Sequence, residues 1–242
     1  MRVKAVIAYD GAAFYGFQAQ TTTPKTVSGA LSRAAAKLGI HAPIVGSGRT
    51  DRGVHATGQV IHFDLPSHWH NDLGKLKTFY NRLLSPHIQI KTITPVDDTF
   101  HARFDAKRRI YRYLFKSTPP TPFENLYACH LHHSDPEKLR IALERFEGTH
   151  DFYYFHKKGS DPGSTVRTII RTDVKAFRRY IVLYIEANGF LRSQVRMIVG
   201  AATAVMHGTL TLEQIDEQLA KKAIHTTMLA PPQGLYLARV IY

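Results

Sequence analysis

A proline-rich segment near the middle of the chain limits how the chain can fold. Residues 117–123 read Ser-Thr-Pro-Pro-Thr-Pro-Phe, and three prolines within six residues continue neither a helix nor a central strand. Strand-like and helix-like runs lie on both sides of this segment. We therefore expect an N-terminal α+β subdomain over residues 1–116 and a C-terminal α+β subdomain over residues 117–242.

Both expected subdomains mix strands and helices. Alternating or β-branched runs predict strands over residues 3–10, 44–45, 59–64, 88–96, 108–115, 167–174, 180–187 and 235–241. Apolar residues at helical spacing predict helices over residues 26–38, 72–84, 135–147, 191–207 and 211–221. The pair Asn188-Gly189 suits a turn of an antiparallel or mixed sheet. The expected fold class is α+β, with two similar subdomains, antiparallel or mixed sheets flanked by helices, and a central cleft where the subdomains meet.

Length and cysteine content narrow the class of protein. A chain of 242 residues with 44% hydrophobic content can bury a core without disulfides or a structural metal. The single cysteine, Cys129, excludes an intrachain disulfide and suggests a reducing compartment. No run of about 18 apolar residues is present. We expect a soluble, cytoplasmic protein that does not bind a membrane.

The charge of the chain indicates the kind of partner. Lys and Arg number 32 against 19 Asp and Glu, a formal net charge of +13, and 14 histidines add charge at lower pH. Such a balance favours a polyanionic partner, most often a nucleic acid, over the alternative of a merely basic protein. Because basic residues alternate with aromatic ones, we expect the central cleft to bind RNA.

One loop combines glycines with an Arg-x-Asp sequence. It reads Gly48-Arg49-Thr50-Asp51-Arg52-Gly53-Val54-His55-Ala56. Arg49 and Asp51 are two residues apart, so in extended backbone they face the same side, and glycines allow close approach to a ligand. A surface turn with an incidental ion pair is the alternative. A phosphate-binding loop is also open, although the Walker pattern is absent.

Residues 108–115 form a strand with basic and aromatic faces. Arg109, Tyr111, Tyr113 and Phe115 share one face, and Arg108, Ile110, Arg112 and Leu114 share the other. A face that mixes arginine and tyrosine suits stacking on bases while cations meet phosphates. The alternative is an amphipathic strand whose tyrosines are half-buried.

A third segment, residues 189–200, places two arginines near the start of an expected helix. Val195, Ile198 and Val199 form an apolar stripe, and Arg192 and Arg196 lie four residues apart on one side. Either these arginines form a solvated edge, or one of them points into the cleft and pairs with a carboxylate. The residues alone leave both interpretations open.

The three segments together resemble the TruA family of tRNA pseudouridine synthases. Further segments agree with it: Asp10-Gly11-x-x-Phe14-Tyr15-Gly16-Phe17-Gln18-x-Gln20, Phe146-x-Gly148-Thr149-x-Asp151-Phe152, Arg167-Thr168-Ile169 and Ala230-Pro231-x-x-Gly234-Leu235. The matches extend from Ala8 to Leu235, and the Gly-Arg-Thr-Asp-x-Gly-Val-His-Ala block is highly specific.

The resemblance implies a function and a set of site residues. By position, Asp51 matches the family's catalytic aspartate, Tyr111 its active-site tyrosine, Arg49 an arginine that displaces the target base, and Arg196 the arginine that pairs with the aspartate. We assign substrate binding to Gln18, His55, Arg108, Arg112 and Arg192. The family implies a homodimer that binds tRNA, needs no metal or cofactor, and isomerises uridine in the anticodon stem-loop, at tRNA positions 38–40.

Two other functions remain as alternatives. A non-catalytic RNA-binding module would use the Arg/Tyr strand alone, but it gains nothing from a carboxylate such as Asp51 facing an anionic ligand. A metal-dependent nuclease would use the histidines at positions 68, 70, 130, 132 and 133, although cysteine and carboxylate partners at zinc-like spacings are missing. We therefore expect no metal site.

Overall fold

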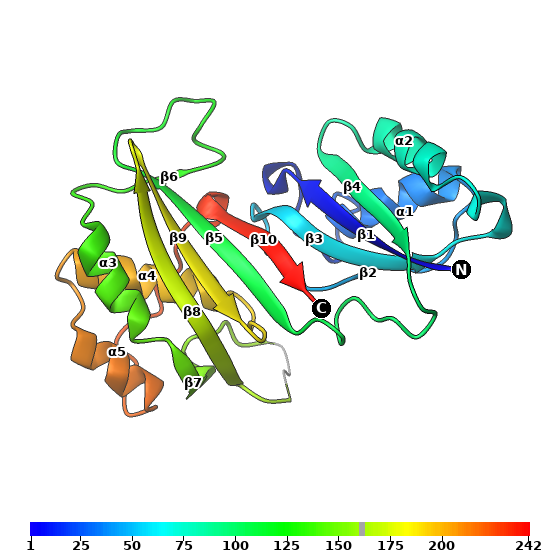
Figure 1. Ribbon diagram of the computed structural model, residues 1–242. Coiled ribbons are helices and arrows are strands. Elements are labelled where there is room, and N and C mark those ends of the chain that lie inside the picture. The colour runs from blue at the N-terminus through cyan, green and yellow to red at the C-terminus, as the bar shows by residue number, and fades with distance from the viewer. Residues whose placement is uncertain (160–162) are drawn as a thin grey trace. The chain divides into compact units, whose positions relative to one another are not determined.

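The computed structural model describes residues 1–159 and 163–242, which form two compact units (Figure 1). The first unit comprises Met1–Lys107 with Tyr236–Tyr242, and the second comprises Arg108–Leu235. The division therefore falls at Lys107 rather than after the strand that ends at Lys116, and the C-terminal strand belongs to the first unit. Tyr236 and Leu237 of that strand pair in parallel with His55 and Ala56 of the first unit.

The first unit is a mixed sheet with two helices. Its strands are β1 (Arg2–Tyr9), β2 (Val45–Gly46), β3 (His55–Asp64), β4 (Ile88–Pro95) and β10 (Leu235–Ile241), and its helices are α1 (Val27–Lys37) and α2 (Leu73–Leu84). β1 lies between β4 and β3 and is antiparallel to both, whereas β10 is parallel to β3. Every second residue of β1 is buried, which is the alternation expected of a strand with one face in the core.

The helices of the first unit begin where side chains can cap them. The Thr26 hydroxyl accepts a hydrogen bond from Gly29 N at the start of α1, and the Asp72 carboxylate accepts one from Lys75 N at the start of α2. Gly39 follows α1 with a φ of +72°, a backbone conformation that glycine adopts without strain. The two helices pack together, and the Tyr80 hydroxyl of α2 donates to Leu31 O of α1.

The second unit is a largely antiparallel sheet with helices on one face (Figure 1). Its strands are β5 (Arg108–Lys116), β6 (Cys129–His130), β7 (Gly148–Asp151), β8 (Val166–Phe177) and β9 (Tyr180–Ala187), and its helices are α3 (Pro136–Glu144), α4 (Gln194–Met206) and α5 (Leu212–Leu219). The order of the longer strands is β5-β9-β8-β7, and β6 pairs with β5 in parallel. α3 packs against both α4 and β8.

Several expected elements differ from the structure: β8 ends at Phe177 rather than at residue 174, and α3 ends at Glu144 rather than at residue 147. β3 begins at His55 rather than at Gln59. α4 begins at Gln194 rather than at Leu191, because Ser193 has a left-handed φ of 58°, which excludes Arg192 from the helix. Asn188-Gly189 does not connect two strands of the sheet. The Asn188 side chain instead accepts a hydrogen bond from Thr168 N and holds the end of β8.

α4 is buried on nearly all sides, not along one stripe as its sequence suggested. Its middle consists of small residues, and a Cβ added at Gly200 would lie 2.4 Å from Met228 O. The glycine therefore lets the backbone of residues 228–230 lie directly on the helix. No helix in the described part of the chain is long and apolar enough to cross a membrane.

Candidate active site

A buried side-chain amide fixes the start of the loop that contains Asp51. Gln59 of β3 is fully buried, and its Oε1 accepts a hydrogen bond of 2.6 Å from the Ser47 hydroxyl. Its Nε2 donates a hydrogen bond of 2.8 Å to Gly48 O. One side chain thus satisfies two groups at the start of the loop, and this fixes the backbone that leads to Asp51.

Thr50 fixes the centre of the loop against the opening segment of the chain. Its hydroxyl lies 2.8 Å from the Tyr9 hydroxyl, and its carbonyl accepts a hydrogen bond of 3.1 Å from Phe17 N. Thr50 is buried, whereas Arg49 is exposed and Asp51 is half-buried. Arg49 and Asp51 are therefore both more exposed than the residue between them, as their two-residue spacing predicts.

Glycines allow this close packing. Gly16 has a φ of +102°, and a Cβ there would lie 3.0 Å from Thr50 O and 3.4 Å from Arg52 N. Gly53 has a φ of +79° and turns the chain from Asp51 into β3, while Val54 N donates to Asp51 O. The loop is thus a turn in which Gly48 O, Thr50 O and Asp51 O each accept a hydrogen bond within the unit.

His55 has a structural place beside this loop. It is 2% exposed, its ring stacks on Tyr236 with centroids 4.7 Å apart, and its Nδ1 lies 3.0 Å from Gly11 N. The same Nδ1 lies 3.3 Å from the Asp10 carboxylate, so the ring also contacts the opening segment of the chain. The described contacts give His55 a role in holding the loop, and its contact with substrate stays a prediction. Gln18, the other predicted binding residue of this segment, is exposed.

In the second unit, the tyrosine face of β5 lies in the core. Tyr113 is 1% exposed, its hydroxyl donates a hydrogen bond of 2.7 Å to Pro231 O, and burial raises its pKa well above the usual range. The expectation that this face stacks on bases is therefore wrong at Tyr113. Tyr111 is 8% exposed and meets the edge of Phe190, with centroids 5.1 Å apart.

Arg196 is oriented by the segment that precedes β10. Its Nε donates a hydrogen bond of 2.7 Å to Ala230 O, and Ala230 N donates to Arg196 O. The start of that segment is fixed by Gln218, a buried glutamine that accepts from His225 N and Thr226 N and donates to Thr226 O. The guanidinium is thus positioned by backbone groups and not by the helix alone.

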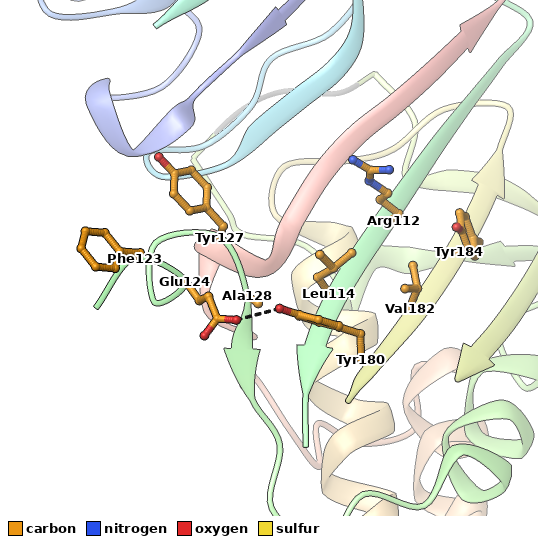
Figure 2. A pocket seen from close by; sticks show the side chains of 9 residues that line it. All are labelled: Arg112, Leu114, Phe123, Glu124, Tyr127, Ala128, Tyr180, Val182 and Tyr184. Atoms are coloured by element: carbon orange, nitrogen blue, oxygen red, sulfur yellow. Dashed lines mark hydrogen bonds between the residues drawn. The ribbon is translucent and has the colours of Figure 1, made fainter. Parts of the chain in front are cut away.

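The remaining predicted binding residues of the second unit differ in their surroundings. Arg108 is exposed and forms an ion pair of 2.8 Å with Glu186, and Arg192 is exposed just before α4. Arg112 lines an open pocket of about 390 Å³ on the sheet face that carries Leu114, Val182 and Tyr184 (Figure 2). The other lining residues are Phe123, Glu124, Tyr127, Ala128 and Tyr180.

The proline-rich segment is attached to this pocket through one carboxylate. Glu124 accepts hydrogen bonds from Lys116 Nζ at 2.5 Å, from Thr121 N at 2.9 Å and from the Tyr180 hydroxyl at 2.8 Å, the last of which Figure 2 shows. The bond from the buried Lys116 contributes most to holding the pKa of Glu124 down, to about 2. The segment is therefore attached at a fixed place on the sheet of its own unit.

The histidines do not form a metal site in the described part of the chain. There, no three His, Cys, Asp or Glu side chains are grouped so that they could hold a metal ion. The rings of His130 and His132 lie 3.9 Å apart without a third ligand. The nuclease alternative therefore lacks its required cluster among these residues.

The predicted site residues are divided between the two units. Arg49, Asp51, Gln18 and His55 belong to the first unit, and Tyr111, Arg108, Arg112, Arg192 and Arg196 belong to the second. The pairing of Asp51 with Arg196 stays a prediction. Sequence reasoning missed the supporting residues Gln59, Gln218 and Phe190. The glutamines carried a usable signal, because each is an amide inside an otherwise apolar pattern.

Comparisons with known proteins agree over nearly the whole chain. A family model described as tRNA pseudouridine synthase matches residues 5–105 and 142–242. A protein of Helicobacter hepaticus named tRNA pseudouridine synthase A is 41% identical over 244 residues, which cover 99% of this chain and 98% of that protein. Proteins of the same name from Wolinella succinogenes and Campylobacter jejuni are 41% and 37% identical, with 98% and 100% of this chain covered and 93% and 100% of theirs. The chain therefore belongs to the TruA family of tRNA pseudouridine synthases.

Proposed function

We propose that this protein isomerises uridine to pseudouridine in the anticodon stem-loop of tRNA, at positions 38–40, with Asp51 as the nucleophile. The observation that carries the proposal is the Asp51 loop, in which a half-buried carboxylate follows an exposed arginine on a turn held by Gln59 and Thr50. Membership of the family and the shared name of its relatives support the tRNA substrate.

The reaction requires a target base that is out of its stack. Uracil must leave C1′, rotate, and rejoin through C5, and extrusion of a stacked base costs a few kcal/mol. Arg49 fills the place of the extruded base and meets phosphate. The Asp51 carboxylate then attacks either C1′ or uracil C6, and forms a covalent intermediate in both routes. The N1–C1′ bond breaks, the C5–C1′ bond forms, the C5 proton is lost, N1 takes up a proton from solvent, and the carboxylate is released.

Two residues of the second unit assist Asp51. Arg196, oriented by Ala230 O, pairs with the carboxylate, because an arginine within about 4–6 Å favours the charged form of an aspartate. Tyr111, which Phe190 supports from one edge, stacks on the uracil and assists the loss of the proton at C5. No step in this sequence changes an oxidation state, so we assign no cofactor.

The charge of the chain supports binding of a long polyanion. A net charge of +13 and the exposed arginines at positions 49, 108 and 192 favour phosphate contacts. Gln18, His55 and Arg112 complete the proposed binding set. We further propose that the protein acts in the cytoplasm as a homodimer that holds one tRNA across both subunits.

Mapping of pseudouridine in tRNA tests the function in the cell. Cells that lack this protein should lose pseudouridine at positions 38–40, and a plasmid-borne copy of the wild-type chain should restore it. A copy with Asp51→Asn should not restore it. A copy with Asp216→Asn, which changes an exposed carboxylate of α5 that pairs with Arg145, should restore it and serves as the matched control. Pseudouridine that persists at these positions in the deletion strain would contradict the proposal.

A further inference from the structure

Beside Asp51, the side chains of Arg52 and Tyr15 form a stacked pair. The guanidinium carbon of Arg52 lies 4.3 Å from the centroid of the Tyr15 ring, within the range of a cation–π interaction. Tyr15 is 42% exposed, and Arg52 is exposed as well. The pair therefore lies on the surface of the first unit, one residue away from the proposed nucleophile.

The backbone holds both partners of this pair in place. Tyr15 N donates to Lys25 O at 2.9 Å, and Gln20 Nε2 donates to Tyr15 O at 2.7 Å. The next residue, Gly16, lies so close to the loop that its added Cβ would be 3.4 Å from Arg52 N. These contacts fix the backbone that carries the ring close to the backbone that carries the guanidinium.

The hydrogen-bond donors of Arg52 are not used by the residues that the structure describes. Across residues 1–159 and 163–242, no hydrogen bond or ion pair engages its guanidinium, and its partner is the face of a ring. A guanidinium carries five N–H donors in its plane, and contact with the face of a ring does not use these donors. A planar, charged group with its donors directed outward suits a bidentate contact with a phosphate.

We propose that Arg52, which lies over the Tyr15 ring, binds a backbone phosphate of the tRNA next to the nucleotide that reacts at Asp51. The proposal rests on the proposed function, which supplies the RNA and its place. It assigns to Arg52 the phosphate and to Tyr15 the orientation of the guanidinium. Arg49, on the other side of Asp51, keeps its separate role at the place of the extruded base.

The test is tRNA binding as a function of salt concentration, measured with Asp51→Asn as the parent so that turnover does not interfere. Arg52→Ala should raise Kd roughly tenfold, and the log–log salt slope should become less steep by about one. Arg52→Lys should keep the slope, because the charge remains, but should lose part of the affinity with the bidentate geometry. Tyr15→Leu should also keep the slope and raise Kd a few-fold.

Lys37→Ala is the matched control, since Lys37 is an exposed cation in the last turn of α1. This variant should leave both Kd and slope close to those of the parent. An unchanged slope in Arg52→Ala would overturn the proposal, whether Kd stays the same or rises through lost base stacking. If Asp51→Asn still forms pseudouridine, the proposed nucleophile is wrong, but the binding measurement still decides whether Arg52 meets a phosphate.

Discussion

The Asp51 loop and the Arg196 region are positioned in different ways. In the loop, buried side chains hold the backbone, and Arg49 and Arg52 take part in no hydrogen bond or ion pair within the described residues. In the second unit, Arg196 and Arg108 are engaged, the first by Ala230 O and the second by Glu186. The guanidinium groups beside Asp51 therefore lack hydrogen-bond and ion-pair partners among the described residues, whereas Arg196 and Arg108 of the second unit each have one.

The largest effect should come from substituting Arg196 or Tyr111, the two residues that we propose assist Asp51. Arg196→Met removes the cation that we propose pairs with the Asp51 carboxylate, so activity at neutral pH should fall roughly a hundredfold.

Tyr111→Phe is the contrasting variant, since it keeps the ring but removes the hydroxyl. It should still bind tRNA but stall at the loss of the C5 proton. The measurement is kcat together with Kd for tRNA in both variants. A wild-type kcat for Arg196→Met would make Arg196 a structural residue.

A smaller effect should distinguish the two buried glutamines. Gln218→Leu leaves backbone groups of His225 and Thr226 unsatisfied and should lower the free energy of unfolding by about 3 kcal/mol, against about 2 kcal/mol for Gln59→Leu. Both variants should also lose kcat while folded, because each glutamine positions one half of the site. Chemical denaturation and steady-state kinetics at 20–25 °C check this, and a folded variant with the wild-type kcat would remove its glutamine from the positioning set.

The smallest effect concerns Glu124, outside the site. Its pKa of about 2 lies below the ordinary value of 4.5, so its contribution to stability is complete above about pH 4.5 and is lost as the pH falls toward 2. Glu124→Gln should therefore lower Tm at pH 7 and weaken the dependence of Tm on pH between 4.5 and 2. Glu144→Gln, which alters an exposed carboxylate of α3, is the control. Equal acid sensitivity of Glu124→Gln and wild type would contradict the assignment.

The parts of the fold that depend on neighbouring residues could be predicted from the sequence. Caps at Thr26 and Asp72 and the alternation of β1 gave element bounds within about two residues. The start of α4 could not be predicted, because a left-handed Ser193 interrupts an otherwise helical pattern. The return of β10 to the first unit also escaped prediction, since no local pattern records which strand a final strand pairs with.

In the candidate site, too, features that depend on neighbouring residues could be predicted from the sequence, and features that depend on distant residues could not. The Asp51 loop lies in one contiguous block, so its residue types and spacing were visible in the sequence. The contact of Arg196 with Ala230 joins residues 34 positions apart, and the burial of Tyr113 depends on Pro231 and Cys129. Contacts between residues distant in the sequence thus determine the orientation of Arg196. They also explain why Tyr113, which was expected to bind RNA, is a core residue.

Release of tritium from C5-labelled uridine in tRNA tests the central claim most directly. Asp51→Asn keeps the size of the side chain and removes the nucleophilic carboxylate, so the account predicts no tritium release above background while tRNA still binds with a Kd near that of the wild type. Substantial release by Asp51→Asn would contradict the account, because the reaction would then proceed without the carboxylate on which every proposed step depends.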